Sequence, residues 1–279
     1  MSLTLPACAK LNLFLHVTGR RDDGYHLLQT LFQLVDLTDE ITLALAPAGV
    51  VELAADGDAP GGADDLTLRA ARRLQAATGT DAGVRIRLRK RIPAGGGLGG
   101  GSSDAAAVLL GLNALWETGL DLDALAALGA GLGADVPVFV RGRTAWAEGI
   151  GERLAPIATA PASYLVIVPD VHVDTSRVFS HARLTRDTPV RTMPAFFETG
   201  GRNDCTPVTR LLHPEVGRAL DWLGAFGEAR MSGTGASIFL RCDDEDTARE
   251  IAARVPRPWQ GFVVGSLEVS PAHRALGLA

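Results

Sequence analysis

Apolar and polar residues alternate along several short segments of the chain, which is the pattern expected of β-strands. In residues 84–92 the apolar positions alternate with Arg85, Arg87 and Arg89. Because successive side chains of a strand point to opposite faces, this segment predicts a strand with one buried face, in an antiparallel or mixed sheet covered on one side. Further strands are predicted at residues 9–17, 40–45, 136–140, 144–147, 164–168, 237–241 and 262–269.

Other segments carry the apolar spacing and the boundary residues of helices. Residues 66–77 follow Asp64 and Asp65, either of which can cap the start of a helix. Residues 105–116, 122–132, part of 214–226, and 246–255 are also predicted to be helical. Strands and helices are mixed without strict βαβ alternation, which favours an α+β fold.

A segment rich in proline and small residues, from Pro156 to Pro161, predicts a join between two lobes. We expect an N-terminal lobe at residues 1–155 and a C-terminal lobe at residues 156–279. Residues 270–279 could pack back onto the first lobe.

The composition fits a globular protein with a core of its own. Of the 279 residues, 47% are hydrophobic and 21% are charged, so a fold of this size needs neither disulfides nor metal ions for stability. The 27 basic and 32 acidic residues give a net charge of −5, which argues against a protein built for nucleic-acid binding.

The cysteines and the N-terminal residues bear on the location of the protein. Three cysteines, an odd number without CxxC spacing, fit a reducing compartment. Residues 1–6 do not have the basic and apolar regions of a signal peptide, and the longest uncharged apolar run, residues 105–116, is shorter than the roughly 20 residues that cross a bilayer. We therefore expect a cytoplasmic protein without a nucleic-acid or membrane partner, and we leave its oligomeric state open.

Glycine is enriched, at 32 residues, or about 11% where roughly 7% is typical. Six of the 32 fall in one segment of eleven residues that lies between a predicted strand and a predicted helix. Free N–H groups at a helix start bind anions, and glycines let the backbone approach a bulky phosphate closely. The predicted nucleotide-binding residues are Pro93, Ala94, Gly95, Gly96, Gly97, Leu98, Gly99, Gly100, Gly101, Ser102 and Ser103.

Other interpretations of this segment fit less well. A flexible linker would not lie between a patterned strand and a helix start. A P-loop requires a lysine after the glycines, and none follows here. Gly95, Gly97 and Gly100 match the dinucleotide-binding pattern, with Asp121 downstream, but the preceding strand alternates with arginines where a nearly all-apolar strand is expected.

Three motifs, in the same order along the chain, resemble those of the GHMP kinases, the family of galactokinase and of homoserine, mevalonate and phosphomevalonate kinases. Residues 6–13 (PACAKLNL) resemble the family's N-terminal motif, residues 93–103 its central motif, and residues 231–237 (MSGTGAS) its C-terminal motif. The resemblance implies a two-lobed fold, with an N-terminal ATP-binding lobe like the second domain of a small-subunit ribosomal protein and a ferredoxin-like C-terminal lobe. It also implies ATP as the phosphoryl donor, accompanied by Mg²⁺, for which the sequence assigns no ligand.

Further segments, residues 10–26, 99–104, 133–137, 203–205 and 270–274, narrow the resemblance to one branch of that family. Members of this branch phosphorylate the 2-hydroxyl of diphosphocytidyl methylerythritol in the non-mevalonate isoprenoid precursor pathway. The sequence departs from the branch at Cys8, where proline is usual, at Gly96, where alanine is usual, and at Asp65, which replaces an asparagine that would face the adenine.

The resemblance also implies the catalytic residues. Lys10 and Asp135 would lie beside the acceptor hydroxyl, where the carboxylate accepts its proton and the ammonium offsets negative charge. Without the resemblance, a solvated strand residue is the more common interpretation of Lys10, and a helix cap is the more common interpretation of Asp135.

The same resemblance implies the residues that bind the substrate. Tyr25 and Phe179 would enclose the pyrimidine, and His26 would hydrogen-bond its edge. Asn12 and Thr175 would contact the polar chain.

The alternatives to this function are a sibling kinase acting on homoserine or mevalonate and, more remotely, a nicotinamide-dependent oxidoreductase or an RNA-binding module.

Overall fold

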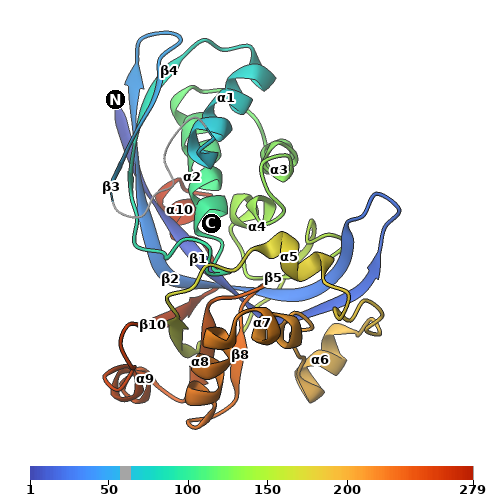
Figure 1. The fold of residues 1–279 in the computed structure, drawn as a ribbon. Helices are drawn as coiled ribbons and strands as arrows, with labels where there is room; N and C mark the ends of the chain where they lie inside the picture. The colour runs from blue at the N-terminus through green and yellow to red at the C-terminus, as the bar shows by residue number, and fades with distance from the viewer. Residues whose placement is uncertain (57–63, 279) are drawn as a thin grey trace.

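The computed structural model describes residues 1–56 and 64–278, which form a mixed sheet with helices packed against it (Figure 1). The strands are β1 (Ser2–Arg20), β2 (His26–Ala46), β3 (Val51–Asp56), β4 (Gly83–Arg89), β5 (Ala145–Glu148), β6 (Arg153–Pro156), β7 (Ser163–Val168), β8 (Ala229–Met231), β9 (Ile238–Cys242) and β10 (Gln260–Leu267). The helices are α1 (Leu66–Thr78), α2 (Gly100–Leu115), α3 (Leu122–Ala130), α4 (Val136–Arg141), α5 (Thr175–Ser180), α6 (Met193–Thr199), α7 (Thr206–Leu212), α8 (Pro214–Gly224), α9 (Glu245–Ala252) and α10 (Pro271–Ala275). The predicted α+β class is confirmed.

The long strands β1 and β2 form a hairpin that runs through the whole molecule (Figure 1). They pair antiparallel from Ser2 opposite Ala44 to Arg20 opposite His26. At different points along its length, β2 also pairs with β4, β5 and β10, so the strands of both halves join in one sheet. A polar turn between Arg20 and His26 joins the two strands at the end of this hairpin.

The larger hydrophobic core lies between β1, β2 and β4 and the helices α1 to α4. The alternation predicted for β4 is confirmed, because its valine, isoleucine and leucine are buried and the arginines between them are exposed. Arg85 and Arg87 form exposed ion pairs with Glu52 and Asp56 of the neighbouring strand β3. The arginines therefore lie on a solvated face of the sheet, and their pairing with β3 argues against an RNA-binding strand.

A second core lies between β7, β8 and β9 and the helices α5, α7, α8 and α9. Leu15 and Val17 of β1 belong to this second core, although they lie near the start of the chain. Helix α10 returns from the end of the chain to the first core, where Ala272 packs and His273 Nε2 lies 2.9 Å from the Val140 carbonyl oxygen. The lobe boundary after residue 155 stays a prediction, and the two predicted lobes include residues 57–63 and 279, which lie outside the described residues.

The strand predicted at residues 136–140 is wrong, because these residues form helix α4. All five residues from Val136 to Val140 are buried, so the segment has no polar face from which a helical period could be read. Pro137 lies in the first turn, where its missing N–H group leaves no hydrogen bond unmade. Packing against α2 and α3 therefore decides the conformation here.

The other predicted elements are present, with shifted boundaries. Helix α2 begins at Gly100, five residues before its predicted start, because the glycines gave no signal for a helix. The short helices α5, α6, α7 and α10, of five to seven residues each, were missed. Within the described residues, no helix is both long and apolar enough to cross a membrane.

Candidate active site

The glycine-rich segment joins β4 to α2 and lines a cavity of about 380 Å³ at the start of that helix. Gly99 is the N-cap residue, and no side chain of the described residues caps the helix there. The first amides of α2 are therefore free to bind an anion, and the helix dipole adds partial positive charge. Of the eleven predicted residues, Leu98 and Ser103 are buried outside the lining of this cavity, and the other nine line it.

Two glycines of this segment are required by close packing against the protein itself. Gly97 has a φ of +75°, and a Cβ atom there would lie 2.3 Å from the Ser232 carbonyl oxygen. Gly99 has a φ of +74°, and a Cβ atom there would lie 2.9 Å from the Phe139 ring. A side chain at either position would be strained and would displace the loop. At these two positions the glycines let the protein pack closely, and the close approach of a phosphate to the segment stays a prediction.

Residues of the 231–237 motif donate hydrogen bonds to carbonyl oxygens of the glycine-rich segment. The Ser232 hydroxyl donates to the Gly97 carbonyl oxygen at 2.9 Å, and the Ser237 amide donates to the Gly96 carbonyl oxygen at 2.9 Å. Ser232 Oγ also accepts a hydrogen bond from the backbone N–H group of Asn12 at 3.1 Å. The three motifs therefore meet at one place, although they lie far apart in the sequence.

Lys10 of β1 lies beneath the glycine-rich segment and is only 2% exposed. Its ammonium donates to the Asn12 Oδ1 atom at 2.6 Å and to the Gly97 carbonyl oxygen at 2.9 Å, and Nζ lies 3.3 Å from Asp135 Oδ2. The Phe32 ring lies 5.4 Å from the ammonium on another side. Lys10 is therefore a fixed, buried cation, and the alternative of a solvated strand residue is wrong.

Asp135 lies directly before α4 and lines the cavity at the glycine-rich segment. Its side chain is 34% exposed, and it makes no capping hydrogen bond to α4 within the described residues. The carboxylate is therefore available to a ligand, which argues against the alternative role as a helix cap.

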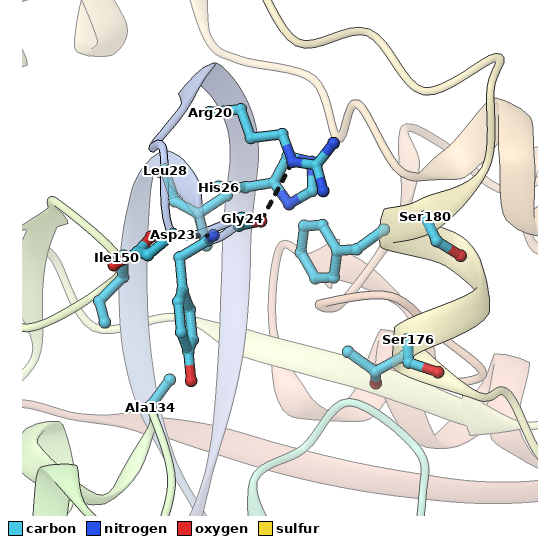
Figure 2. Close-up of a pocket in the computed structure, with 12 residues that line it drawn as sticks. Arg20, Asp23, Gly24, His26, Leu28, Ala134, Ile150, Ser176 and Ser180 are labelled. Carbon is cyan, nitrogen blue, oxygen red and sulfur yellow. Dashed lines mark hydrogen bonds between the residues drawn. The ribbon is translucent and has the colours of Figure 1, made fainter.

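A second cavity, of about 490 Å³, lies between the tip of the β1–β2 hairpin and helix α5 (Figure 2). Arg20 and His26 lie on the hairpin side of this cavity, and Ser176 and Ser180 lie on the side of α5. The predicted substrate-binding residues Tyr25, His26, Thr175 and Phe179 all line it.

The two cavities adjoin near Asp135. Thr175 lines both cavities, and the adjacent residues Ala134 and Asp135 line one cavity each. A molecule that extends from the second cavity past Thr175 would therefore come close to the carboxylate of Asp135.

The aromatic residues of the second cavity are arranged around His26. The His26 and Phe179 rings are stacked, with centroids 5.1 Å apart, whereas Tyr25 is 60% exposed. Arg186, which the sequence analysis missed, donates from Nε to His26 Nε2 at 3.0 Å. Burial, and then the charges of Arg186 and Arg20, lower the pKa of His26 below its usual value, so the imidazole is neutral at pH 7.

The two predicted contacts to the polar chain differ in position. Thr175 faces both cavities, and its hydroxyl lies 2.9 Å from the Thr234 hydroxyl. Asn12 is 2% exposed and lies behind Lys10; its Oδ1 accepts from Lys10 and its Nδ2 donates to Thr30 Oγ1 at 3.0 Å. Asn12 therefore holds Lys10 in place, and its contact with a substrate stays a prediction.

A third cavity, of about 240 Å³, adjoins the glycine-rich segment and contains a buried charge cluster that the sequence analysis missed. Lys90 Nζ lies 2.7 Å from Asp104 Oδ2 and 2.5 Å from Asp39 Oδ2. Burial raises the pKa of Asp104 to about 8, against the opposing effect of Lys90. Asp65, the predicted helix cap, accepts from the Thr67 amide at 2.8 Å and also lines this cavity.

Two other residues at the first cavity could contact a nucleotide or its metal ion. His172 lies against Gly95, and Asp174 lines the cavity near Asp135. Within the described residues, no cluster of three or more His, Cys, Asp or Glu side chains could hold a metal ion by itself. Mg²⁺ usually binds through one or two carboxylates together with substrate phosphates and water, and the carboxylate of Asp174 fits that requirement.

Together, an anion-binding helix start, a buried lysine and a carboxylate form a site suited to phosphoryl transfer. Residues 65–143 match the GHMP kinases N terminal domain, and residues 192–261 match the GHMP kinases C terminal domain. The chain therefore belongs to the GHMP kinase family of ATP-dependent small-molecule kinases, as the three motifs predicted.

The similar proteins identify a branch of this family. A protein of Halorhodospira halophila named 4-diphosphocytidyl-2-C-methyl-D-erythritol kinase is 53% identical over 277 residues, covering 98% of this chain and 96% of that protein. A crystal structure of a 4-(cytidine 5'-diphospho)-2C-methyl-D-erythritol kinase superposes with a TM-score of 0.81 at 36% identity, covering 95% of this chain and 99% of the other. A homoserine kinase of Cytophaga hutchinsonii superposes with a TM-score of 0.70 at 19% identity, covering 97% and 96%, which shows a shared fold alone.

Proposed function

We propose that this protein transfers the γ-phosphoryl group of ATP to the 2-hydroxyl of 4-diphosphocytidyl-2-C-methyl-D-erythritol. The observation that carries the proposal is that two cavities adjoin at Thr175 near the Lys10–Asp135 pair, one beside a helix start with free amides and the other lined by aromatic side chains. The relatives named for this activity, at 53% and 36% identity over nearly the whole chain, support it.

The triphosphate would lie in the first cavity, against the glycine-rich segment. The amides at the start of α2 would bind its oxygens, and the positive end of the helix dipole would stabilise their charge. The adenine would extend toward the third cavity, which shares Gly95 and Gly101 with the first. Asp65 would accept a hydrogen bond from the exocyclic amine of the adenine, a contact that a carboxylate oxygen can make as well as an amide oxygen.

Lys10 and Asp135 would act on the acceptor hydroxyl. Asp135 would accept its hydrogen bond and orient it for in-line attack, and would take the proton as the new O–P bond forms and the bond to ADP breaks. Lys10, held by Asn12 and the Gly97 carbonyl oxygen, would stabilise the charge that develops on the transferred group. Because orientation and charge dominate phosphoryl transfer, we expect proton removal to occur late.

Mg²⁺ would accompany the nucleotide and neutralise charge on the β- and γ-phosphates. Asp174 lines the first cavity together with Asp135, and it would hold the ion directly or through water, leaving Asp135 to the acceptor hydroxyl.

The second cavity would bind the cytidine end of the substrate. Tyr25 would stack on one face of the pyrimidine, and Phe179 would enclose the pyrimidine from another side. Because one face of the Phe179 ring stacks on His26, its other face would contact the pyrimidine. Thr175, at the junction of the cavities, would contact the polar chain between the pyrimidine and the reacting hydroxyl.

A substrate panel tests the proposal. The purified protein with ATP and Mg²⁺ should phosphorylate the diphosphocytidyl substrate and should leave homoserine and mevalonate nearly unchanged. A preference for homoserine or mevalonate would overturn the proposal and would support a sibling kinase on the same fold.

We also propose that the protein acts in the cytoplasm. Its three cysteines, Cys8, Cys205 and Cys242, are buried free thiols, as expected in a reducing compartment. The substrates would be ATP and a small molecule, with neither nucleic acid nor membrane as a partner.

A further inference from the structure

Arg186 joins the loop after helix α5 to the tip of the β1–β2 hairpin. Besides its bond to His26, its guanidinium donates to the carbonyl oxygens of Leu184, Phe179 and His181, at 3.1, 2.9 and 3.0 Å. Four acceptors at fixed positions hold the guanidinium in one orientation. Arg186 therefore holds Phe179 and His26 together on one wall of the second cavity, where their rings stack.

The bond from Arg186 decides which nitrogen of His26 carries the proton. A guanidinium has only donors, so the imidazole nitrogen that faces it must be unprotonated. A neutral imidazole has one N–H group, and it must then be at Nδ1. Within the part of the chain that the structure describes, no group hydrogen-bonds to His26 Nδ1, and the residue lines the cavity. His26 therefore presents an N–H donor to a ligand.

We propose that Arg186 is a positioning residue that makes the pyrimidine site specific for cytosine over uracil, by holding His26 in the tautomer that donates from Nδ1. The inference rests on the proposed function, since it assumes a pyrimidine in the second cavity. Cytosine presents an acceptor at ring N3, to which the Nδ1–H group donates. Uracil carries a hydrogen at N3, so two donors would face each other and the imidazole could not change tautomer without losing the bond from Arg186.

The test compares Arg186→Met with Arg186→Lys, and uses Arg183→Met as a matched control on an exposed arginine of the same loop. Methionine keeps the apolar stem but cannot donate, whereas lysine can still donate to His26 Nε2. For each protein, kcat/KM is measured with the diphosphocytidyl substrate and with its uridine analogue. In Arg186→Met the ratio of the two should fall about tenfold or more, mainly through KM, with the KM of ATP unchanged. Arg186→Lys should keep most of the discrimination, and Arg183→Met all of it.

A nitrogen-15 NMR measurement reads the tautomer of His26 directly, without a substrate. Wild type and Arg186→Lys should show the proton at Nδ1, and Arg186→Met should show a mixture with the Nε2–H form. An unchanged cytidine-to-uridine ratio in Arg186→Met, or a wild-type His26 protonated at Nε2, would overturn the inference. A variant that only loosens the loop would lower activity on both substrates equally, which also contradicts it. If wild type does not phosphorylate the diphosphocytidyl substrate, the proposed function fails, while the NMR result still decides whether Arg186 fixes the tautomer.

Discussion

The ammonium of Lys10 and the carboxylate of Asp135 lie 3.3 Å apart, and Asp135 lines the first cavity, which shares Thr175 with the second. Lys10 is also held by Asn12 and by the Gly97 carbonyl oxygen, so its position does not depend on Asp135 alone. Asp135 is partly exposed to the cavity and is therefore the member of the pair that a substrate can reach first. This asymmetry suggests that Asp135 handles the acceptor hydroxyl and that Lys10 supplies a fixed charge.

Replacing Asp135 with asparagine should lower kcat by about 10²–10⁴ and leave both KM values nearly unchanged. The amide has the same shape and keeps an acceptor oxygen, but it cannot take the proton of the hydroxyl. Steady-state kinetics with the proposed substrate and ATP measure this effect. Asp123→Asn, at an exposed carboxylate paired with Arg141, is the matched control and should keep full activity. If Asp135→Asn retained more than about a third of the wild-type kcat, another group would have to act on the hydroxyl.

Lys10→Met should also lower kcat, because the fixed positive charge is lost. It should lower the melting temperature as well, since Asn12 Oδ1 and the Gly97 carbonyl oxygen lose a donor in a buried place. The double variant with Asp135→Asn should lose less activity than the product of the two single losses, because the two residues are in contact and act on the same transfer step. Independent, multiplying effects in this double-mutant cycle would show that the two residues serve separate steps.

Ser102→Asp should change stability and nucleotide binding in opposite directions. Ser102 lies in the first turn of α2, where a carboxylate stabilises a helix by roughly 0.3–1 kcal/mol, and it also lines the first cavity, where the triphosphate would lie. The same negative charge would repel the triphosphate, so ATP affinity should fall about tenfold or more. Calorimetry of ATP binding and thermal unfolding measure the two effects, with Ser102→Ala as the neutral control. Full ATP affinity in the folded aspartate variant would place the triphosphate elsewhere.

Tyr25→Ala should raise the KM of the diphosphocytidyl substrate and leave the KM of ATP nearly intact. Loss of one stacking face, at roughly 1–3 kcal/mol, corresponds to a weakening of about 5- to 150-fold. Tyr25 is 60% exposed, so the melting temperature should change little. Tyr25→Phe keeps the ring and should behave like wild type. Equal damage to the binding of both substrates would indicate a structural role for Tyr25.

Asp104→Asn should alter how stability depends on pH. Burial raises the pKa of Asp104 from 3.8 to about 8, so between these values the folded state holds a proton that the unfolded state releases. This group's contribution to stability is therefore full below about pH 4 and is lost as the pH rises to about 8. The asparagine variant lacks that titration. As the pH rises through this window, the free energy of unfolding of wild type should therefore fall relative to that of the variant. Denaturant unfolding at several pH values measures it, and a pH-independent difference between the two proteins would rule out a buried, protonated Asp104.

The sequence by itself determined the features that depend on neighbouring residues. The alternation in β4 follows from the period of a strand, and the succession of strand, glycines and helix start is local as well. Three motifs were sufficient to identify the family, and they predict which segment binds the nucleotide. Tyr25, His26, Thr175 and Phe179 followed from the resemblance, and the structure brings all four to one cavity.

Long-range packing decided the rest. Residues 136–140 are apolar throughout, and only burial between α2 and α3 makes them a helix. The bond from Arg186 to His26 and the Lys90–Asp104 pair join segments whose own sequences contain no sign of the partner. The hydrogen bonds of the Asn12 side chain with Lys10 and Thr30 were also decided in this way. The physical reason is that periodicity and propensity act over a few neighbouring residues, whereas the hydrogen-bond partner, the burial and the pKa of a side chain are set by whatever the folded chain places within a few ångströms of it.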